Sequence, residues 1–209
     1  MNDSGLWPHQ ERVFDLLLGE RRNVILQAPT GSGKTRAALY PFLTALDFDT
    51  EYHQRFPHKC LYSVPMRVLA RQFYEEYSQT VRRYGLKYAL GISPAIQTGE
   101  RAGSPELSAN LIFATIDQTL SSFLLAPYSL PLRRANLNAA AVMGSYLVFD
   151  EFHLYAPDST LPTALHMLQM LRGIAPFVLM TATFSRDMLN GLAQVLDAEV
   201  VPGSDEEQE

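Results

Sequence analysis

Residues 28–35 read Ala-Pro-Thr-Gly-Ser-Gly-Lys-Thr, and this stretch decides the fold. It follows a short apolar strand pattern, Asn23–Gln27, and it opens a helical pattern, Lys34–Leu46. A strand, a glycine-rich loop and a helix in this order form a cradle for phosphate groups, because the loop backbone and the helix start both present N–H groups to the anion. The stretch therefore predicts a nucleotide site between a strand and a helix.

The residue types in this loop match the parts of a nucleoside triphosphate. Gly31 and Gly33 allow the tight turn that directs bare N–H groups at phosphate oxygens. Lys34 supplies a positive charge for the β- and γ-phosphates, and the Thr35 hydroxyl is a ligand for magnesium. A glycine-rich turn that carries a lysine by chance is the alternative, which the placement of Lys34 and Thr35 disfavours. We expect ATP and Mg2+ as cofactors, held by Thr30, Gly31, Ser32, Gly33, Lys34 and Thr35.

An acidic pair ends a later apolar strand pattern, Tyr146–Asp150. In a magnesium–nucleotide site Asp150 would hold the metal ion, mostly through water. Glu151 would orient or deprotonate the water that attacks the γ-phosphate. The alternative is an ordinary acidic turn at a strand end. The phosphate loop, which ends 115 residues before Asp150, favours the catalytic interpretation.

Two further polar groups lie where the same site would need them. Thr181 and Thr183 follow the strand pattern Phe177–Thr181, and their hydroxyls would hydrogen-bond Asp150 or Glu151 and sense the nucleotide. A plain threonine-rich strand end is the alternative. Gln10 lies 24 residues before Lys34, and its amide suits the edge of an adenine base because it offers both a donor and an acceptor.

Apolar strand patterns alternate with helical periodicity along the chain. This alternation predicts a mostly parallel α/β sheet with helices on both faces, and ligands at the carboxyl ends of its strands. The expected strands are Asn23–Gln27, Lys59–Val64, Leu86–Gly91, Asn110–Ala114, Tyr146–Asp150 and Phe177–Thr181. The expected helices are Pro8–Leu18, Lys34–Leu46, Val68–Arg83, Ile116–Leu125, Thr160–Arg172 and Arg186–Leu196.

Two stretches interrupt this alternation. Residues 93–108 are rich in Gly, Pro, Ser and Thr and are expected to form an exposed loop. Residues 126–145 are long for a connection, and loops of such length are usually functional or ordered by a partner.

The composition is that of an ordinary soluble globular protein, and we expect a cytoplasmic location. The net charge is −5, but four acidic residues lie in residues 205–209, and without them 17 basic residues face 18 acidic ones. A near-neutral body can still carry a basic groove, so charge neither supports nor excludes nucleic acid. No apolar run approaches the ~18 residues of a membrane helix. The N-terminus carries no secretion signal, and the single cysteine, Cys60, excludes an internal disulfide.

Read together, these pieces resemble the first motor domain of a superfamily 2 helicase. Gln10 resembles the Q-motif glutamine, residues 28–35 resemble motif I, residues 150–153 motif II and residues 181–183 motif III. Ala28 replaces the usual first glycine of motif I, a variant known in nucleic-acid motor proteins. The resemblance implies a RecA-like P-loop NTPase domain in residues 1–200, with residues 201–209 as an acidic tail or a linker. It also implies that His153 couples hydrolysis to strand binding.

Three further runs resemble the nucleic-acid-contacting motifs of that superfamily. Arg67 lies in a run like motif Ia, Thr98 and Gly99 in one like motif Ib, and Thr115 and Gln118 in one like motif Ic. Arg67 and helix-start N–H groups would hold backbone phosphates without regard to sequence and with strong salt dependence. Thr115 and Gln118 also fit a capping box for their helix, and one helix start can serve both roles.

The runs Thr115-Ile116-Asp117-Gln118 and Asp150-Glu151-Phe152-His153 narrow the resemblance. They look like the CRISPR-associated helicase of type I interference systems, and the Asp-Glu-Phe-His form looks most like the type I-D branch. The resemblance implies an ATP-dependent enzyme that unwinds target DNA. Its partners would be single-stranded DNA, a Cascade-like effector complex and a separate nuclease subunit.

The chain departs from that family in two ways. It has no adjacent His-Asp pair, so we expect no nuclease metal site. No Gln-x-x-Gly-Arg-like run follows Thr183, so the arginine finger would come from a second RecA-like domain, and hydrolysis by this domain alone would be weak. Two alternatives stay open: another RNA or DNA helicase of the superfamily, or a non-catalytic docking module that binds nucleotide as a structural ligand.

Overall fold

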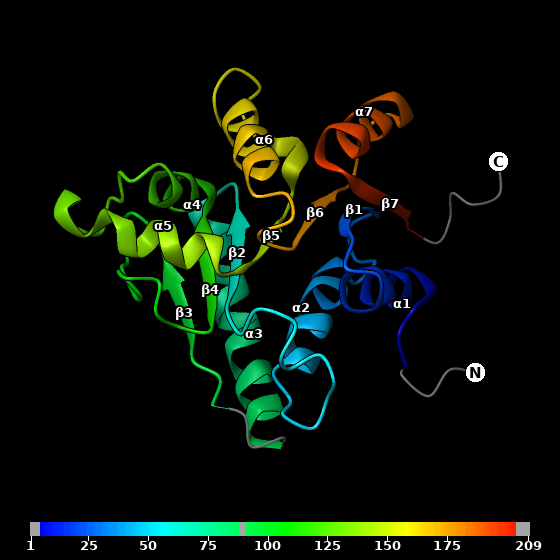
Figure 1. Cartoon of the computed structure of the whole chain (residues 1–209), viewed down its shortest axis with the longest axis horizontal. Coiled ribbons are helices and arrows are strands. Elements are labelled where there is room, and N and C mark those ends of the chain that lie inside the picture. Colours follow the sequence, from blue (N-terminus) through cyan, green and yellow to red (C-terminus); the bar gives the residue numbers. More distant parts are fainter. Residues whose placement is uncertain (1–4, 88–90, 204–209) are drawn as a thin grey trace.

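Seven strands form one parallel sheet in the computed structural model, which describes residues 5–87 and 91–203. Their order across the sheet is β3-β4-β2-β5-β6-β1-β7 (Figure 1). Every neighbouring pair is parallel, so the carboxyl ends of the strands lie along the same edge. The strands are β1 Asn23–Gln27, β2 Cys60–Val64, β3 Pro94–Gln97, β4 Leu111–Thr115, β5 Tyr146–Phe149, β6 Phe177–Thr181 and β7 Ala198–Pro202.

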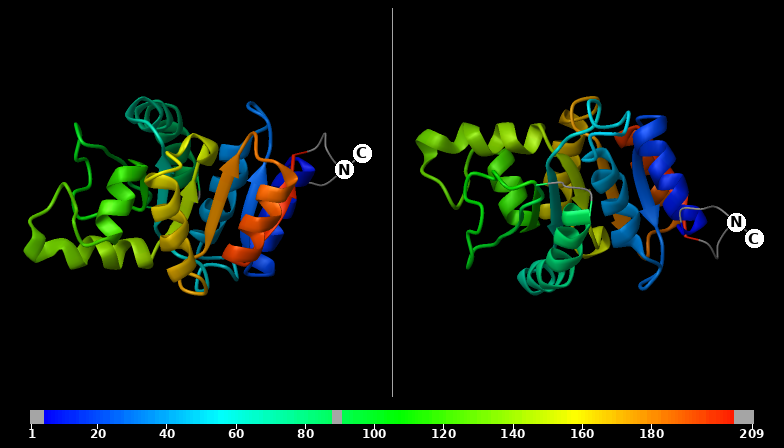
Figure 2. Two further views of the ribbon diagram at one scale, coloured as in Figure 1. Left: turned by 90° about the horizontal axis from the view of Figure 1, so that it is seen from above. Right: turned by 90° about the horizontal axis from the view of Figure 1, so that it is seen from below.

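Helices cover both faces of this sheet (Figure 2). One face is covered by α1 Pro8–Phe14, the π-helical turn η1 Asp15–Gly19, α2 Lys34–Ala45 and α3 Arg67–Lys87. The other face is covered by α4 Ile116–Phe123, α5 Ala135–Met143, α6 Thr160–Met170 and α7 Arg186–Leu196. Two short 3-10 turns complete the described structure. The turn η2 Leu132–Arg134 precedes α5, and the turn η3 Phe152–Leu154 follows β5.

The central strands are continuously apolar because both of their faces are buried. In β1, Val24 and Leu26 pack into the core beneath α1–α3, whereas Ile25 packs into the core beneath α4–α7. The same alternation holds in β2, where Tyr62 and Leu61 point to opposite cores. Successive side chains of a strand point to opposite faces, so one apolar run supplies two cores at once.

The predicted fold class is confirmed: an α/β domain with a parallel sheet between two helical layers. The expected strand Asn23–Gln27, strand Phe177–Thr181 and helix Arg186–Leu196 have the predicted bounds, and most other elements shift by a few residues at one or both ends. The residues that end β1, β5 and β6 therefore meet at one edge, as the spacing of the motifs predicted.

The predicted strand Leu86–Gly91 is wrong where the structure describes it. Leu86 and Lys87 continue α3, and residues 88–90 lie outside the described residues. Gly85 lies inside α3, where a glycine costs only about 1 kcal/mol relative to alanine and does not end the helix. The third strand instead lies at Pro94–Gln97, within the stretch predicted to be an exposed loop, and all four of its residues are buried.

Two other elements went unpredicted. The long connection of residues 126–145 contains η2 and α5, whose run of alanines and apolar residues gives no clear helical periodicity. β7 occupies Ala198–Pro202, so the expected boundary at residue 200 falls inside a strand that pairs with β1. Glu199 and Pro202 are unusual in strands and mask it. No helix in residues 5–87 and 91–203 has the length and apolar character to cross a membrane.

Candidate functional site

The phosphate loop lies between the carboxyl end of β1 and the start of α2. Gly31 and Gly33 have φ values of 84° and 72°, the left-handed region that glycine adopts without strain. Gly33 has a second reason to be glycine, because a Cβ atom there would lie 2.4 Å from Nε2 of Gln10. Ala28 at the loop start donates its backbone N–H to the carbonyl of Thr181, at 3.1 Å. The loop is thus tied to β6 and turns as the glycine spacing predicted.

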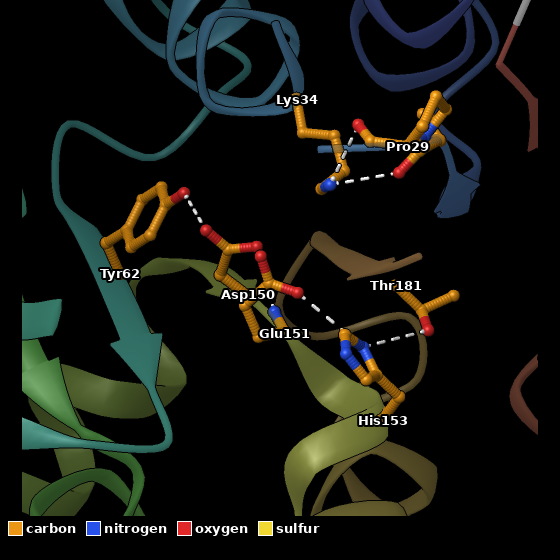
Figure 3. A network of polar contacts seen from close by, with 8 residues as sticks. Pro29, Lys34, Tyr62, Asp150, Glu151, His153 and Thr181 are labelled. Atoms are coloured by element: carbon orange, nitrogen blue, oxygen red, sulfur yellow. Dashed lines mark hydrogen bonds and ion pairs between the residues drawn. The ribbon is translucent and has the colours of Figure 1, made fainter. Parts of the chain in front are cut away.

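Lys34 is the first residue of α2 and is buried within the loop. Its Nζ atom donates to the carbonyl oxygens of Ala28, at 2.9 Å, and Pro29, at 3.2 Å (Figure 3). The ammonium group therefore points into the concave side of the loop, where a phosphate would be bound. Of the other predicted loop residues, Thr30 is exposed, and Ser32 donates its hydroxyl to Pro29, at 2.7 Å.

Two residues of α1 hold the loop from outside. Gln10 is buried, donates to the carbonyl of Gly33, at 3.2 Å, and accepts from the backbone of Trp7, at 3.1 Å. His9 is also buried and places Nε2 2.9 Å from the carbonyl of Ser32. Gln10 therefore supports the phosphate loop in this structure, and its expected contact with an adenine base stays a prediction.

Asp150 follows β5 and is almost fully buried. Its Oδ2 atom accepts from the hydroxyl of Tyr62 on β2, at 2.6 Å, and its Oδ1 atom accepts from the backbone of Glu151, at 2.8 Å. Burial raises the pKa of Asp150, and the Tyr62 hydrogen bond opposes that rise. The positive charge of Lys34 also lowers the pKa, so this residue and Asp150 interact across the same space (Figure 3).

The Tyr62 hydroxyl joins the two predicted magnesium ligands. It lies 2.6 Å from Asp150 and 3.4 Å from Oγ1 of Thr35, the second residue of α2. Burial and the neighbouring Asp150 carboxylate raise the pKa of Tyr62 well above its ordinary value, so the hydroxyl keeps its proton and donates. A hydroxyl oxygen and a carboxylate are the hard oxygen ligands that Mg2+ prefers. This donor set fits a magnesium ion bound to a triphosphate.

Glu151 adopts a left-handed backbone conformation, with φ at 49°, which is uncommon for a residue with a side chain. The turn directs its carboxylate to His153, whose Nδ1 lies 3.5 Å from Oε2 of Glu151. Strain of this kind is found at functional sites, where the surrounding structure enforces it. It orients Glu151 and His153 toward one another at the end of β5.

Thr181 contacts His153, whereas the sequence predicted a hydrogen bond to Asp150 or Glu151. Its hydroxyl lies 3.5 Å from Nδ1 of His153, so the link to Glu151 runs through the imidazole (Figure 3). The left-handed turn at Glu151 brings the histidine, rather than the carboxylate, next to β6. Thr183 lies two residues beyond β6 and is exposed.

A hollow gathers most of the residues predicted to bind nucleic acid. It encloses about 320 Å³ beside the carboxyl ends of β3 and β4, and its lining includes Arg67, Gly99, Thr115 and Gln118. Arg67 pairs with Glu100 at 2.8 Å, and both side chains are mostly exposed. Thr98 is buried and accepts from the backbone of Arg101, at 3.1 Å. The tertiary structure thus joins three separate motifs around one space.

The predicted capping box at Thr115 and Gln118 is not seen. Thr115 takes the N-cap position of α4, but its side chain makes no capping hydrogen bond. Gln118 is buried and accepts from the amide of Gln97 on β3, at 3.3 Å. The Gln118 side chain therefore links α4 to β3 and does not cap the helix.

Sequence reasoning missed three residues of these sites: Tyr62, His9 and Tyr128. Tyr62 sits in an apolar strand, and a buried tyrosine hydroxyl almost always needs a partner, which is the signal that was available. His9 is next to Gln10 in the same turn of α1. Tyr128 lines the hollow from the connection before α5, and nothing in the local sequence marks it.

Comparison with known proteins identifies the family. A sequence profile of the DEAD/DEAH box helicase family matches residues 7–190. The ATP-dependent DNA helicase Hel308 of Methanococcus vannielii is 28% identical over 180 residues, which cover 85% of this chain and 22% of that protein. The Activating signal cointegrator 1 complex subunit 3 of Dictyostelium discoideum is 28% identical over 149 residues, which cover 69% of this chain and 6% of that protein.

Solved structures share the fold. The DUF1998 helicase MrfA bound to DNA and AMPPNP superposes with a TM-score of 0.70 at 20% identity, covering 96% of this chain and 27% of that one. A DEAD box protein from Methanococcus jannaschii superposes with a TM-score of 0.64 at 21% identity, covering 94% of this chain and 49% of that one. In each of these comparisons the chain covers less than half the length of the matched protein, from 6% to 49%. With its profile match over most of its length, it belongs to the DEAD/DEAH box helicase family of superfamily 2.

Proposed function

We propose that this chain is the ATP-binding half of an ATP-dependent DNA helicase or translocase. One observation carries the proposal: Thr35 and Asp150, which come from distant parts of the chain, both lie at the Tyr62 hydroxyl while Lys34 faces the same space. The relative Hel308 is a DNA helicase, and MrfA was crystallised on DNA with an ATP analogue. Both support DNA as the strand and ATP as the nucleotide.

Each residue of the site would have a separate task in hydrolysis. Lys34 and the loop N–H groups would bind the β- and γ-phosphates, and Thr35 and Asp150 would hold Mg2+, which neutralises charge on the phosphates when bound. Glu151 would accept a proton from the attacking water. His153, held between Glu151 and Thr181, would transmit the state of the site to the bound strand.

A second RecA-like domain would complete the motor. The curated relatives are several times longer than this chain, which leaves room for one. The domain would supply an arginine finger, whose absence costs about 10³–10⁵ in rate in related phosphoryl-transfer enzymes. Hydrolysis would then open and close the two domains and move them along single-stranded DNA.

We further propose that the motor serves type I CRISPR interference, together with a Cascade-like effector complex and a separate nuclease subunit. The support is the resemblance of the Thr115–Gln118 and Asp150–His153 runs to the type I-D helicase. A cytoplasmic location would follow from that role.

ATP turnover tests the motor. The protein that joins this chain to its second motor domain should hydrolyse ATP faster with single-stranded DNA than without it. Glu151→Gln should remove the turnover but keep nucleotide binding. A near-zero rate that no strand stimulates would instead favour a docking module that binds nucleotide as a structural ligand.

Matched substrates test the strand and the pathway. Unwinding of DNA in preference to an equivalent RNA duplex would support a DNA motor. The reverse preference would support an RNA helicase, a candidate favoured by relatives such as the U5 small nuclear ribonucleoprotein 200 kDa helicase. Stimulation of unwinding by a guide-loaded type I effector complex on its target DNA would support the CRISPR role, and its absence would contradict it.

A further inference from the structure

We propose that Tyr128 stacks on the base of an unpaired nucleotide held in the hollow beside Arg67. The proposal rests on the proposed function, since it requires that this surface binds a single strand. It assigns a base-binding position to a connection that lies outside every motif described above. The ligand is defined by its chemistry: an unpaired base on a sugar–phosphate backbone, from either DNA or RNA.

Tyr128 has the exposure that a stacking platform needs. It is 73% exposed, although large aromatic residues usually bury their rings, and it lines the hollow together with Arg67 and Gly99. An exposed ring at the wall of a hollow that also contains Arg67 can offer its face to a base. Stacking of this kind tolerates any base, because every base has a π-face.

The connection that carries Tyr128 is anchored on both sides. Ala126 donates its backbone N–H to Ser121 at the end of α4, at 2.8 Å, and the Ser129 hydroxyl donates to the carbonyl of Pro105, at 3.1 Å. Pro127, directly before the tyrosine, is buried. Beyond it, Arg134 forms an ion pair with Glu106. The ring is therefore presented from a fixed backbone, which lowers the entropy lost on binding.

The lining of the hollow combines groups that attract a phosphate with one that repels it. Arg67 and the N–H groups at the start of α4 attract a phosphate. Asp117 lines the same hollow and is exposed, and its carboxylate repels a second phosphate. A space with one cation, one anion and one aromatic ring suits a single nucleotide better than a run of backbone phosphates.

Strand binding by the 209-residue chain tests the proposal. The probes are fluorescein-labelled oligodeoxythymidine, oligouridine and an abasic strand of the same length, with anisotropy as the readout. Tyr128→Ala should weaken binding of the base-bearing strands by roughly tenfold, within the range seen when a stacking residue is removed. It should leave binding of the abasic strand unchanged, because the phosphate contacts remain. Tyr128→Phe should bind like the wild type.

Phe48→Ala is the matched control, because Phe48 is 72% exposed and lines a different hollow. Equal loss of affinity in both variants, or an equal loss on the abasic strand, would overturn the proposal. So would a Tyr128→Ala variant that binds every strand like the wild type, an outcome that leaves the proposed function standing. A wild-type chain that binds no strand would overturn both. The affinities for oligodeoxythymidine and oligouridine distinguish the two sources of the base.

Discussion

The two candidate sites at the carboxyl edge of the sheet differ in how their charged groups are solvated. At the nucleotide site Lys34 and Asp150 are buried and held by hydrogen bonds. At the hollow proposed to bind a strand, Arg67 and Glu100 pair in the open, with side chains 61% and 75% exposed. Buried polar groups interact strongly and are costly to leave unpaired, whereas exposed ion pairs contribute about 0–1 kcal/mol.

The difference teaches that one sheet edge can carry buried and exposed charged groups side by side, which suits the two kinds of recognition proposed for it. A triphosphate is a fixed ligand, so a rigid and buried constellation suits it. A nucleic-acid strand slides and is exchanged, so exposed, salt-sensitive contacts suit it. Substitutions at the first site should therefore have large effects and those at the second small ones, and the following predictions run in that order.

Lys34→Ala is expected to have the largest effect. It removes the only side-chain cation that the described structure places within the phosphate loop, and ATP affinity should fall by at least about 100-fold, the loss expected for a charge-assisted contact in a buried site. Isothermal titration with a non-hydrolysable ATP analogue measures this, and circular dichroism checks the fold. Lys59→Ala is the control, because Lys59 donates to the carbonyl of Leu107, a residue that does not line the phosphate loop. Unchanged affinity in Lys34→Ala would refute the site.

Asp150→Asn should remove magnesium-dependent hydrolysis yet stabilise the nucleotide-free fold. Burial raises the pKa of Asp150, so the native state disfavours the ionised carboxylate and folding carries a cost once that group is charged. The cost is absent below the unfolded pKa of 3.8 and develops as pH rises from there through the higher folded pKa. The gain in unfolding free energy at pH 7 should be about 1–3 kcal/mol.

Denaturation in urea at several pH values tests this. An advantage of Asp150→Asn that persists unchanged at the most acidic pH would show that ionisation of Asp150 is not its cause. A variant less stable than the wild type at pH 7 would show that the surroundings stabilise the carboxylate.

Tyr62→Phe should destabilise the protein by about 1.5–2 kcal/mol, because a hydrogen bond to a charged group is stronger than one to a neutral group. Tyr146→Phe is a close control: Tyr146 is also fully buried, but its hydroxyl donates to the neutral carbonyl of Ala38, at 3.0 Å. The control should lose about 1 kcal/mol. Thermal unfolding of both variants gives the comparison. Equal losses would mean that the charge of Asp150 does not strengthen the Tyr62 hydrogen bond.

Glu100→Gln should have the smallest effect, and in the opposite direction. It frees Arg67 from its ion pair and should strengthen binding of single-stranded DNA by about two- to fivefold at low salt, with stability nearly unchanged. Glu75→Gln removes the same charge from the Arg71–Glu75 pair on the exposed surface of α3 and is the control. If both variants bind equally well, the gain reflects net charge alone and not release of Arg67.

The nucleotide site was largely predictable because its parts follow strands. Lys34, Asp150 and Thr181 each lie next to the carboxyl end of a strand with a continuous apolar run, and parallel strands align those ends. The contacts among them were not predictable. Thr181 meets His153 because Glu151 turns left-handed, and no local pattern announces such a turn.

The weaker elements escaped prediction for a related reason. β3 and β7 lie at the two edges of the sheet, where a strand needs less apolar surface and tolerates proline. Both carry a proline, Pro94 and Pro202, and both take their strand form from a stronger neighbour, β4 and β1. When a segment becomes a strand by pairing with its neighbour, its own pattern of apolar residues does not show that it is a strand.

The sequence by itself determined the alternation of strands and helices, the phosphate loop and the acidic pair, because periodicity and glycine spacing are local properties of the chain. Tertiary structure decided which side chains meet. Tyr62 reaches Asp150 across 88 residues, and Arg67, Gly99 and Tyr128 line one hollow from three separate segments. Such meetings depend on strand order and on the packing of helices over the sheet, and these follow from burial of the whole chain at once.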